Sequence, residues 1–140
     1  KGHFLSAHAI GTIRINGENG VYGSTRAQFG GQKMEVAFAQ EVEAGDAEIW
    51  TTTSGETPRA YRVKIEKISD ADPRRNMVLR VVDRELLAQT GGIVQGMSGS
   101  PIVQNGRLVG AVTHVLVNDP TRGYGIFAQT MLEQAERVTE

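Results

Sequence analysis

The sequence predicts an all-β fold, a sandwich or a barrel, and three observations support this class. Short runs rich in β-branched residues alternate apolar with polar side chains, as strands with one buried face do. Turn-forming residues separate these runs. The 140 residues include 17 glycines and 4 prolines, which supply many turns. A chain of this length forms one domain and buries a substantial core.

The predicted strands follow one another along most of the chain. The clearest is Ala60–Ile68, in which Tyr61, Val63 and Ile65 alternate with charged residues. Asn105-Gly106 lies between two apolar runs and is a strong β-hairpin signal. The predicted strands are Ile10–Ile15, Met34–Ala39, Ala47–Thr53, Ala60–Ile68, Met77–Val82, Ile102–Val103, Leu108–Val117 and Tyr124–Ala128.

Two helices interrupt this pattern. The segment Asp83–Gln89 begins at a residue type that caps helix N-termini and stops at Gly91. The segment Thr130–Thr139 has its apolar residues on one face, so we expect it to pack on the barrel as a terminal helix.

Composition excludes several classes of function. The 15 basic and 16 acidic residues nearly cancel, so no overall field attracts nucleic acid or an anionic membrane. No apolar run approaches the roughly 20 residues of a membrane-spanning helix. The absence of cysteine removes disulfides, thiolate metal sites and a cysteine nucleophile, and leaves the compartment open. Because the histidines also lack metal-ligand spacing, we expect no metal site and no cofactor.

The segment Gly96–Pro101 carries the strongest chemical signal. A serine nucleophile needs a hydroxyl that projects from a tight turn, backbone N–H groups that converge on the oxyanion, and a base. Glycines on both sides of the Met97-Ser98 pair permit such a turn. We therefore expect Ser98 to be the nucleophile, with the N–H groups of Gly96 and Ser98 as the oxyanion hole. Ser100 is the alternative nucleophile, and an ordinary Gly-Ser turn is the alternative without catalysis.

The order of elements after this segment resembles the second barrel of trypsin-like peptidases. In those enzymes a nucleophile loop is followed by a hairpin, a glycine-containing strand beside the substrate, a short Gly-aromatic strand and a final helix. This sequence shows the same order from Gly96 onward, with Thr113 and His114 on the strand that would flank a substrate cleft. The resemblance implies that the chain is mainly the nucleophile-bearing barrel.

A denser resemblance, from about Asp83 to Phe127, is to the stage IV sporulation protein B peptidases of endospore-forming bacteria. It implies a serine endopeptidase that works in the space between the forespore and mother-cell membranes. There it would cleave a membrane-anchored regulatory protein, which triggers activation of a late sigma factor. The matching segments are Gly91–Ile102, Gln104–Gly106, Gly110–Val115 and Val117–Phe127.

The resemblance also assigns residues. The family nucleophile falls on Ser98, and the family acid, fifteen residues earlier, falls on Asp83. An N-cap role explains Asp83 equally well. The family histidine lies further upstream, and no position here matches it. We therefore expect the 140 residues to be one peptidase-domain fragment that lacks its base and an upstream PDZ domain, with little activity alone.

Other interpretations remain open. His114 could line the cleft, act as the base or be an ordinary strand residue, and His3 lies in the single Gly-His pair. The chain could instead be a non-enzymatic barrel that binds peptide strands, or a module that self-associates or pairs with its upstream segment through unpaired edges. Sequence alone gives neither the cleavage specificity nor whether a fragment arises by self-cleavage.

Overall fold

The computed structural model describes eight stretches of the chain, and every structural statement below concerns these residues. They contain ten strands, a short 3-10 helix, the α-helix α1 and a further helical segment at residues 128–131. The described stretches are residues 2–7, 11–16, 26–29, 32–51, 59–69, 75–93, 97–116 and 118–131.

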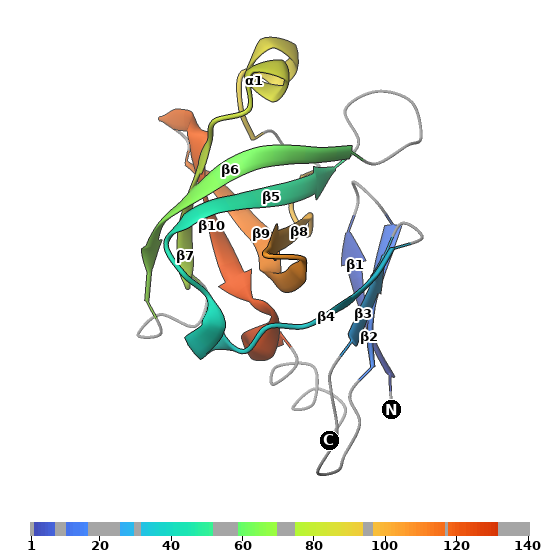
Figure 1. Cartoon of the computed structure of the whole chain (residues 1–140). Helices are drawn as coiled ribbons and strands as arrows, with labels where there is room; N and C mark the ends of the chain where they lie inside the picture. The colour runs from blue at the N-terminus through green and yellow to red at the C-terminus, as the bar shows by residue number, and fades with distance from the viewer. Residues whose placement is uncertain are drawn as a thin grey trace.

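Six antiparallel strands form a closed barrel in the order β10-β7-β6-β5-β8-β9. Closure leaves no strand of the barrel with an unpaired edge. Figure 1 shows these strands surrounding a common interior. The strands are β5 (Gly45–Thr51), β6 (Arg59–Ile68), β7 (Met77–Val81), β8 (Pro101–Gln104), β9 (Arg107–Leu116) and β10 (Asp119–Phe127).

The barrel interior holds the hydrophobic core, and the side-chain alternation of the strands builds it. On β6, Tyr61, Val63 and Ile65 are buried while the residues between them are exposed. Strands β5 and β7 repeat this pattern, so each contributes one apolar face. The largest fully buried side chains are Tyr61, Ile49, Ile65, Met77, Leu79, Leu86, Ile93, Ile102 and Leu108.

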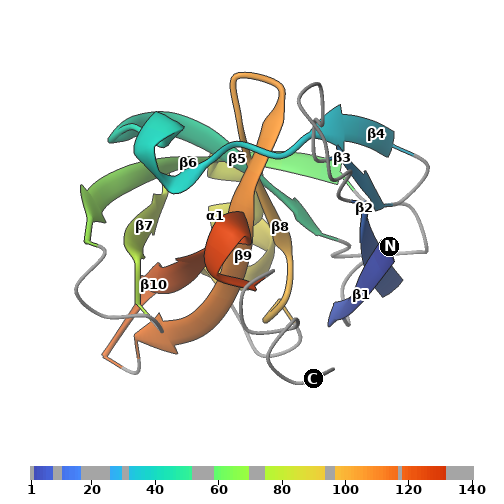
Figure 2. The same ribbon diagram turned by 90° about the horizontal axis from the view of Figure 1, so that it is seen from below.

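A second sheet lies beside the barrel (Figures 1 and 2). It has four antiparallel strands in the order β1-β2-β3-β4. Its link to the barrel runs from β4 to β9, where Val36 bridges Leu108 and the N–H of Ala37 donates to the Leu108 carbonyl at 2.9 Å. The strands are β1 (Gly2–Ala7), β2 (Gly11–Asn16), β3 (Arg26–Phe29) and β4 (Gln32–Glu35).

The predicted strand Met34–Ala39 is wrong beyond its first residues. Strand β4 ends at Glu35, and a 3-10 helix occupies Ala39–Glu41. Side chains satisfy the backbone here, because the N–H of Phe38 donates to Glu41 Oε1 at 2.8 Å and that of Ala39 to Gln129 Oε1 at 2.9 Å. These donors are therefore not available to a neighbouring strand.

Most other predicted elements are confirmed with shifted ends. The main difference is β10, which begins at Asp119 instead of Tyr124, and β1 and β3 were not predicted. The Asn105-Gly106 hairpin is confirmed, with φ of 54° and 73° at its two central residues. The predicted terminal helix begins earlier, with helical residues 128–131, and its remainder lies outside the described residues.

Helix α1 (Arg84–Thr90) is confirmed close to its predicted limits. It is drawn at the top of Figure 1, and its buried Leu86 joins the barrel core. It ends at Gly91, whose φ of 75° is the left-handed conformation that terminates helices without strain at glycine. Among the described residues, no helix has the length and apolar character to cross a membrane.

Candidate active site

Ser98 lies in a tight β-turn formed by residues 97–100. The N–H of Ser100 donates to the Met97 carbonyl at 3.0 Å, and Gly99 has a φ of 88°. A positive φ at the third turn residue is the mark of a type II turn, which favours glycine there. Met97 is buried while Ser98 is exposed, so the turn anchors one side chain in the core and projects the next outward.

Backbone hydrogen bonds hold this turn against β9. The Gly99 N–H donates to the Val112 carbonyl at 2.6 Å, and the Val112 N–H donates to the Ser100 carbonyl at 2.9 Å. Ser98 Oγ in turn donates to the carbonyl of Thr113 at 3.3 Å. Ser98 therefore has a defined position relative to the strand predicted to flank the substrate.

Thr113 occupies an irregularity in the pairing of β9 with β10. His114 pairs with Tyr124 and Val112 pairs with Gly125, so Thr113 is an extra residue on its strand. Such β-bulges bend a strand and redirect groups, and they are common next to active sites. Here the bulged residue presents its carbonyl to Ser98, while its Oγ1 donates to the Tyr124 carbonyl at 3.2 Å. The sequence shows no recognised signal for this bulge.

Of the two residues predicted to form the oxyanion hole, the structure describes only Ser98. Gly96 lies outside the described residues. Within the part of the chain that the structure describes, the Ser98 N–H has no hydrogen-bond acceptor. A backbone donor beside the nucleophile is the group that stabilises a developing oxyanion. The assignment of Gly96 and Ser98 to this role stays a prediction.

Ser100 has a different environment from Ser98. Its relative exposure is 0%, and its Oγ has no hydrogen-bond partner among the described residues. A hydroxyl without solvent contact cannot reach a substrate carbonyl. The geometry therefore favours Ser98 over Ser100 as the nucleophile.

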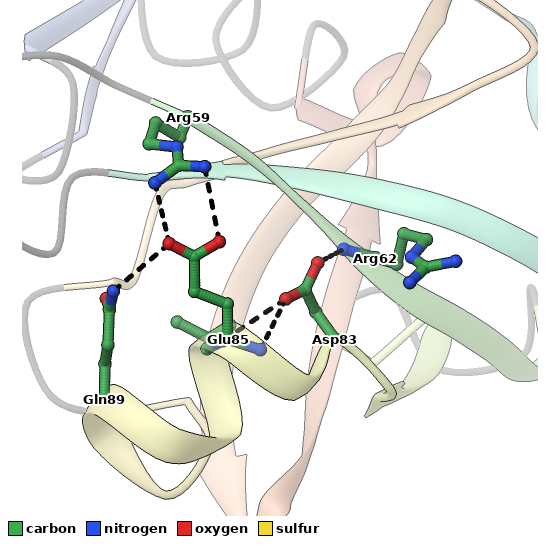
Figure 3. Close-up of polar contacts among 6 residues, drawn as sticks. Arg59, Arg62, Asp83, Glu85 and Gln89 are labelled. Carbon is green, nitrogen blue, oxygen red and sulfur yellow. Dashed lines mark hydrogen bonds and ion pairs between the residues drawn. The ribbon is translucent and has the colours of Figure 1, made fainter.

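Asp83 is the N-cap of α1, as one of its two sequence interpretations predicts. Figure 3 shows its carboxylate between the helix and β6. Oδ1 accepts from the N–H groups of Glu85 and Leu86 at 3.0 and 3.3 Å, and Oδ2 accepts from the N–H of Arg62 at 3.0 Å. Partial burial raises the pKa of Asp83, but these backbone donors outweigh it and hold the pKa below its ordinary value.

Among the described side chains, no histidine is hydrogen-bonded to Ser98. His114 is exposed on β9 and, among the described residues, makes no hydrogen bond to Ser98. His3 lies on β1, and its side chain is outside what the structure describes. The structure thus brings Thr113 to Ser98 and leaves the identity of the base, and the triad-acid role of Asp83, as predictions.

A closed antiparallel barrel with an exposed serine on a Gly-containing turn has the architecture of a trypsin-like serine protease. The model of the SpoIVB peptidase S55 family matches residues 1–132, so the chain belongs to that family. It is therefore a serine endopeptidase, as the sequence predicts, and its substrate is a protein.

Solved structures agree on the fold. The chain is similar to two crystal structures of the Rv3671c protease of Mycobacterium tuberculosis H37Rv, both in the inactive form and one a Ser-to-Ala mutant. Each has a TM-score of 0.57 and 16% identity and covers 99% of this chain. The match spans 80% of the mutant chain and 83% of the other. No curated protein matches the chain.

Proposed function

We propose that Ser98 is the nucleophile that attacks the scissile carbonyl of the substrate. The observation that carries this proposal is its exposed position on a turn that two backbone hydrogen bonds fix against β9. Attack forms the bond from Ser98 Oγ to the carbonyl carbon, a base takes the hydroxyl proton, and the oxyanion faces backbone N–H groups. The base then gives the proton to the leaving amine, and water hydrolyses the acyl-enzyme.

The hydrogen bond from the Ser98 hydroxyl to the Thr113 carbonyl has to break before Ser98 can attack. A backbone carbonyl accepts a hydrogen bond but cannot take the proton. The Ser98 hydroxyl must therefore rotate away from the Thr113 carbonyl, 3.3 Å distant, when it engages its base. At this distance the bond is longer than the 2.7–2.8 Å typical of O–H···O pairs, so the rotation costs little.

The proposed substrate is a membrane-anchored regulatory protein outside the cytoplasm, and its cleavage would activate a late sigma factor. Membership of the SpoIVB peptidase family supports this role. The net charge of −1 provides no overall electrostatic attraction to nucleic acid. Recognition then depends on the surface around Ser98.

A complementation experiment tests this role. The full-length gene, with Ser98→Ala or with Ser100→Ala, is expressed in an endospore-forming bacterium that lacks its own peptidase of this family. We expect a reporter under the late sigma factor to fall to background with Ser98→Ala. The Ser100→Ala variant should leave the reporter within about twofold of wild type, since that hydroxyl is buried. Full reporter activity with Ser98→Ala would contradict the proposal.

A further inference from the structure

We propose, on the basis that Ser98 is the nucleophile, that Arg75 binds an acidic side chain of the substrate while it is stacked on Tyr124. This acidic residue lies within about three positions of the scissile bond, because an extended chain of that length reaches from one site to the other. The inference rests on the proposed function and adds to it a feature of the substrate, namely a negative charge close to the cleaved bond.

Two aligned side chains on β9 and β10 lie next to the nucleophile. The Thr113 carbonyl is 3.3 Å from Ser98 Oγ, and His114 is the next residue along β9. His114 is exposed and pairs directly with Tyr124 on β10, the strand beside it in Figure 2. Directly opposite residues of antiparallel strands point to the same face of the sheet. His114 and Tyr124 therefore form a continuous surface that begins one residue from the contact with Ser98.

The alternation of side chains along β10 shows that this surface is on the outside of the barrel. A Cβ on Gly123 would lie 2.9 Å from Ile93 Cδ1, and Ile93 is a core residue with an exposure of 1%. Gly123 therefore faces the interior, and the next residue, Tyr124, faces outward. Its side chain is half-buried, so part of it is accessible to a substrate.

Arg75, just before β7, supplies a cation at this surface. Its guanidinium carbon lies 5.0 Å from the centroid of the Tyr124 ring, within the range of a cation–π contact, and its side chain is exposed. Stacking uses the flat face of a guanidinium and leaves its in-plane N–H groups free for a carboxylate, which they bind through two parallel hydrogen bonds. Among the described residues, no carboxylate forms an ion pair with Arg75.

The two other arginines of this face are already matched by acidic side chains. Arg80 and Arg122 are directly opposite each other on β7 and β10. Glu66 lies 3.1 Å from Arg80 and 3.2 Å from Arg122, and Asp119 lies 3.8 Å from Arg122. Of these three arginines, Arg75 is thus the one whose charge no described side chain compensates. Charge complementarity favours a substrate carboxylate at Arg75.

An extended substrate spans the distance from the nucleophile to this surface. The scissile carbonyl carbon must approach Ser98 Oγ to about 3–3.5 Å before attack. Each further residue of an extended chain advances about 3.3 Å, and successive side chains alternate in direction. A residue two or three positions away can therefore place its side chain against Tyr124. There an aspartate or glutamate meets Arg75, whereas a lysine is repelled by it.

A set of peptides tests the proposal. In a peptide that the full-length enzyme cleaves, Asp, Asn or Lys is placed in turn at each of about three positions on either side of the scissile bond. We expect Asp to exceed Asn in kcat/KM about fivefold or more at one position, because hydrogen bonds to a charged acceptor are the stronger ones. Arg75→Glu should reverse the order, so that Lys exceeds Asp at that position, with the kcat/KM of the Asn peptide within about twofold of wild type.

Lys64→Glu is the matched control. It makes the same change in net charge at an exposed residue of β6, and β7 separates β6 from β10. The preference for Asp should survive in this variant. Binding gives a readout that needs no turnover, because the full-length Ser98→Ala variant should hold the same peptides uncleaved. Fluorescence anisotropy of labelled peptides should give dissociation constants in the same order, Asp below Asn below Lys.

Three results would overturn the proposal. The first is equal cleavage, within about twofold, of the Asp and Asn peptides at every position. The second is a preference for Asp that Arg75→Glu leaves unchanged, and the third is a preference that Lys64→Glu abolishes equally. Failure of the nucleophile assignment looks different, because Ser98→Ala would then still cleave the peptides. The ratio of Asp to Lys cleavage in Arg75→Glu would still decide whether Arg75 binds the acidic side chain.

Discussion

At the scale of single residues, Gly99 determines whether Ser98 projects correctly. Its φ of 88° is a left-handed conformation that costs a residue with a Cβ about 1–2 kcal/mol. We expect Gly99→Ala to lower the free energy of unfolding by about that amount and kcat/KM by at least tenfold. Urea unfolding and peptide hydrolysis in the full-length enzyme measure the two effects.

Gly106 provides the control for this substitution. It has a φ of 73° in the β8–β9 hairpin, and a Cβ there would meet no atom within 4 Å. Gly106→Ala should therefore lower stability by a similar amount, with peptidase activity unchanged. Equal activity in the two variants would show that the turn at Gly99 does not control catalysis.

The sequence predicted the turn that carries Ser98 better than it predicted the surroundings of that turn. The spacing of glycines around Ser98 indicates a tight turn because backbone conformation at glycine is a local property. The bulge at Thr113 depends on the pairing of β9 with β10, which no local pattern encodes. For Asp83 the sequence left two roles open, because aspartate fits both an N-cap and a catalytic acid. Only the structure shows which backbone donors its carboxylate binds.

At the scale of elements, α1 should respond to pH through Asp83. Its folded-state pKa is lowered, so its stabilising contribution is present above the unfolded value of about 3.9 and is lost as pH falls through the folded value. We expect wild type to exceed Asp83→Asn in free energy of unfolding by a constant amount from pH 7 to about 5. This difference should shrink below about pH 4.

Urea unfolding followed by fluorescence of Trp50, the single tryptophan, measures this difference. Asparagine keeps the shape of aspartate without its charge, so other carboxylates titrate alike in both proteins. A difference that persists undiminished at pH 2.5 would show that the charge of Asp83 contributes nothing to the helix contacts.

Elements were predictable where one local pattern determines them. Strand β6 alternates through its whole length, and Asn105-Gly106 supplies the two positive φ values of its hairpin. The error at Met34–Ala39 has a tertiary origin, because Gln129, 90 residues away, takes the N–H of Ala39. The sequence did not predict that β10 begins at Asp119, because aspartate is typical of turns. The Asp119 side chain does accept hydrogen bonds from Thr121, as it would in a turn.

At the scale of the whole molecule, the closed barrel is the stable frame and the four-stranded sheet is attached to it through β4 and β9. Close packing of the barrel strands depends on glycine, since a Cβ on Gly110 would lie 1.9 Å from the Ile126 carbonyl oxygen. In the described sheet, β1 pairs only with β2. Self-association, or pairing with another segment of the protein, stays a prediction for that edge.

The central claim is that Ser98 is the nucleophile, and fluorophosphonate labelling with mass-spectrometric mapping of the adduct tests it most directly. The full-length protein should carry one adduct on Ser98, retained in Ser100→Ala and lost in Ser98→Ala. An adduct on another residue, or an enzyme that still cleaves protein after Ser98→Ala, would contradict the account.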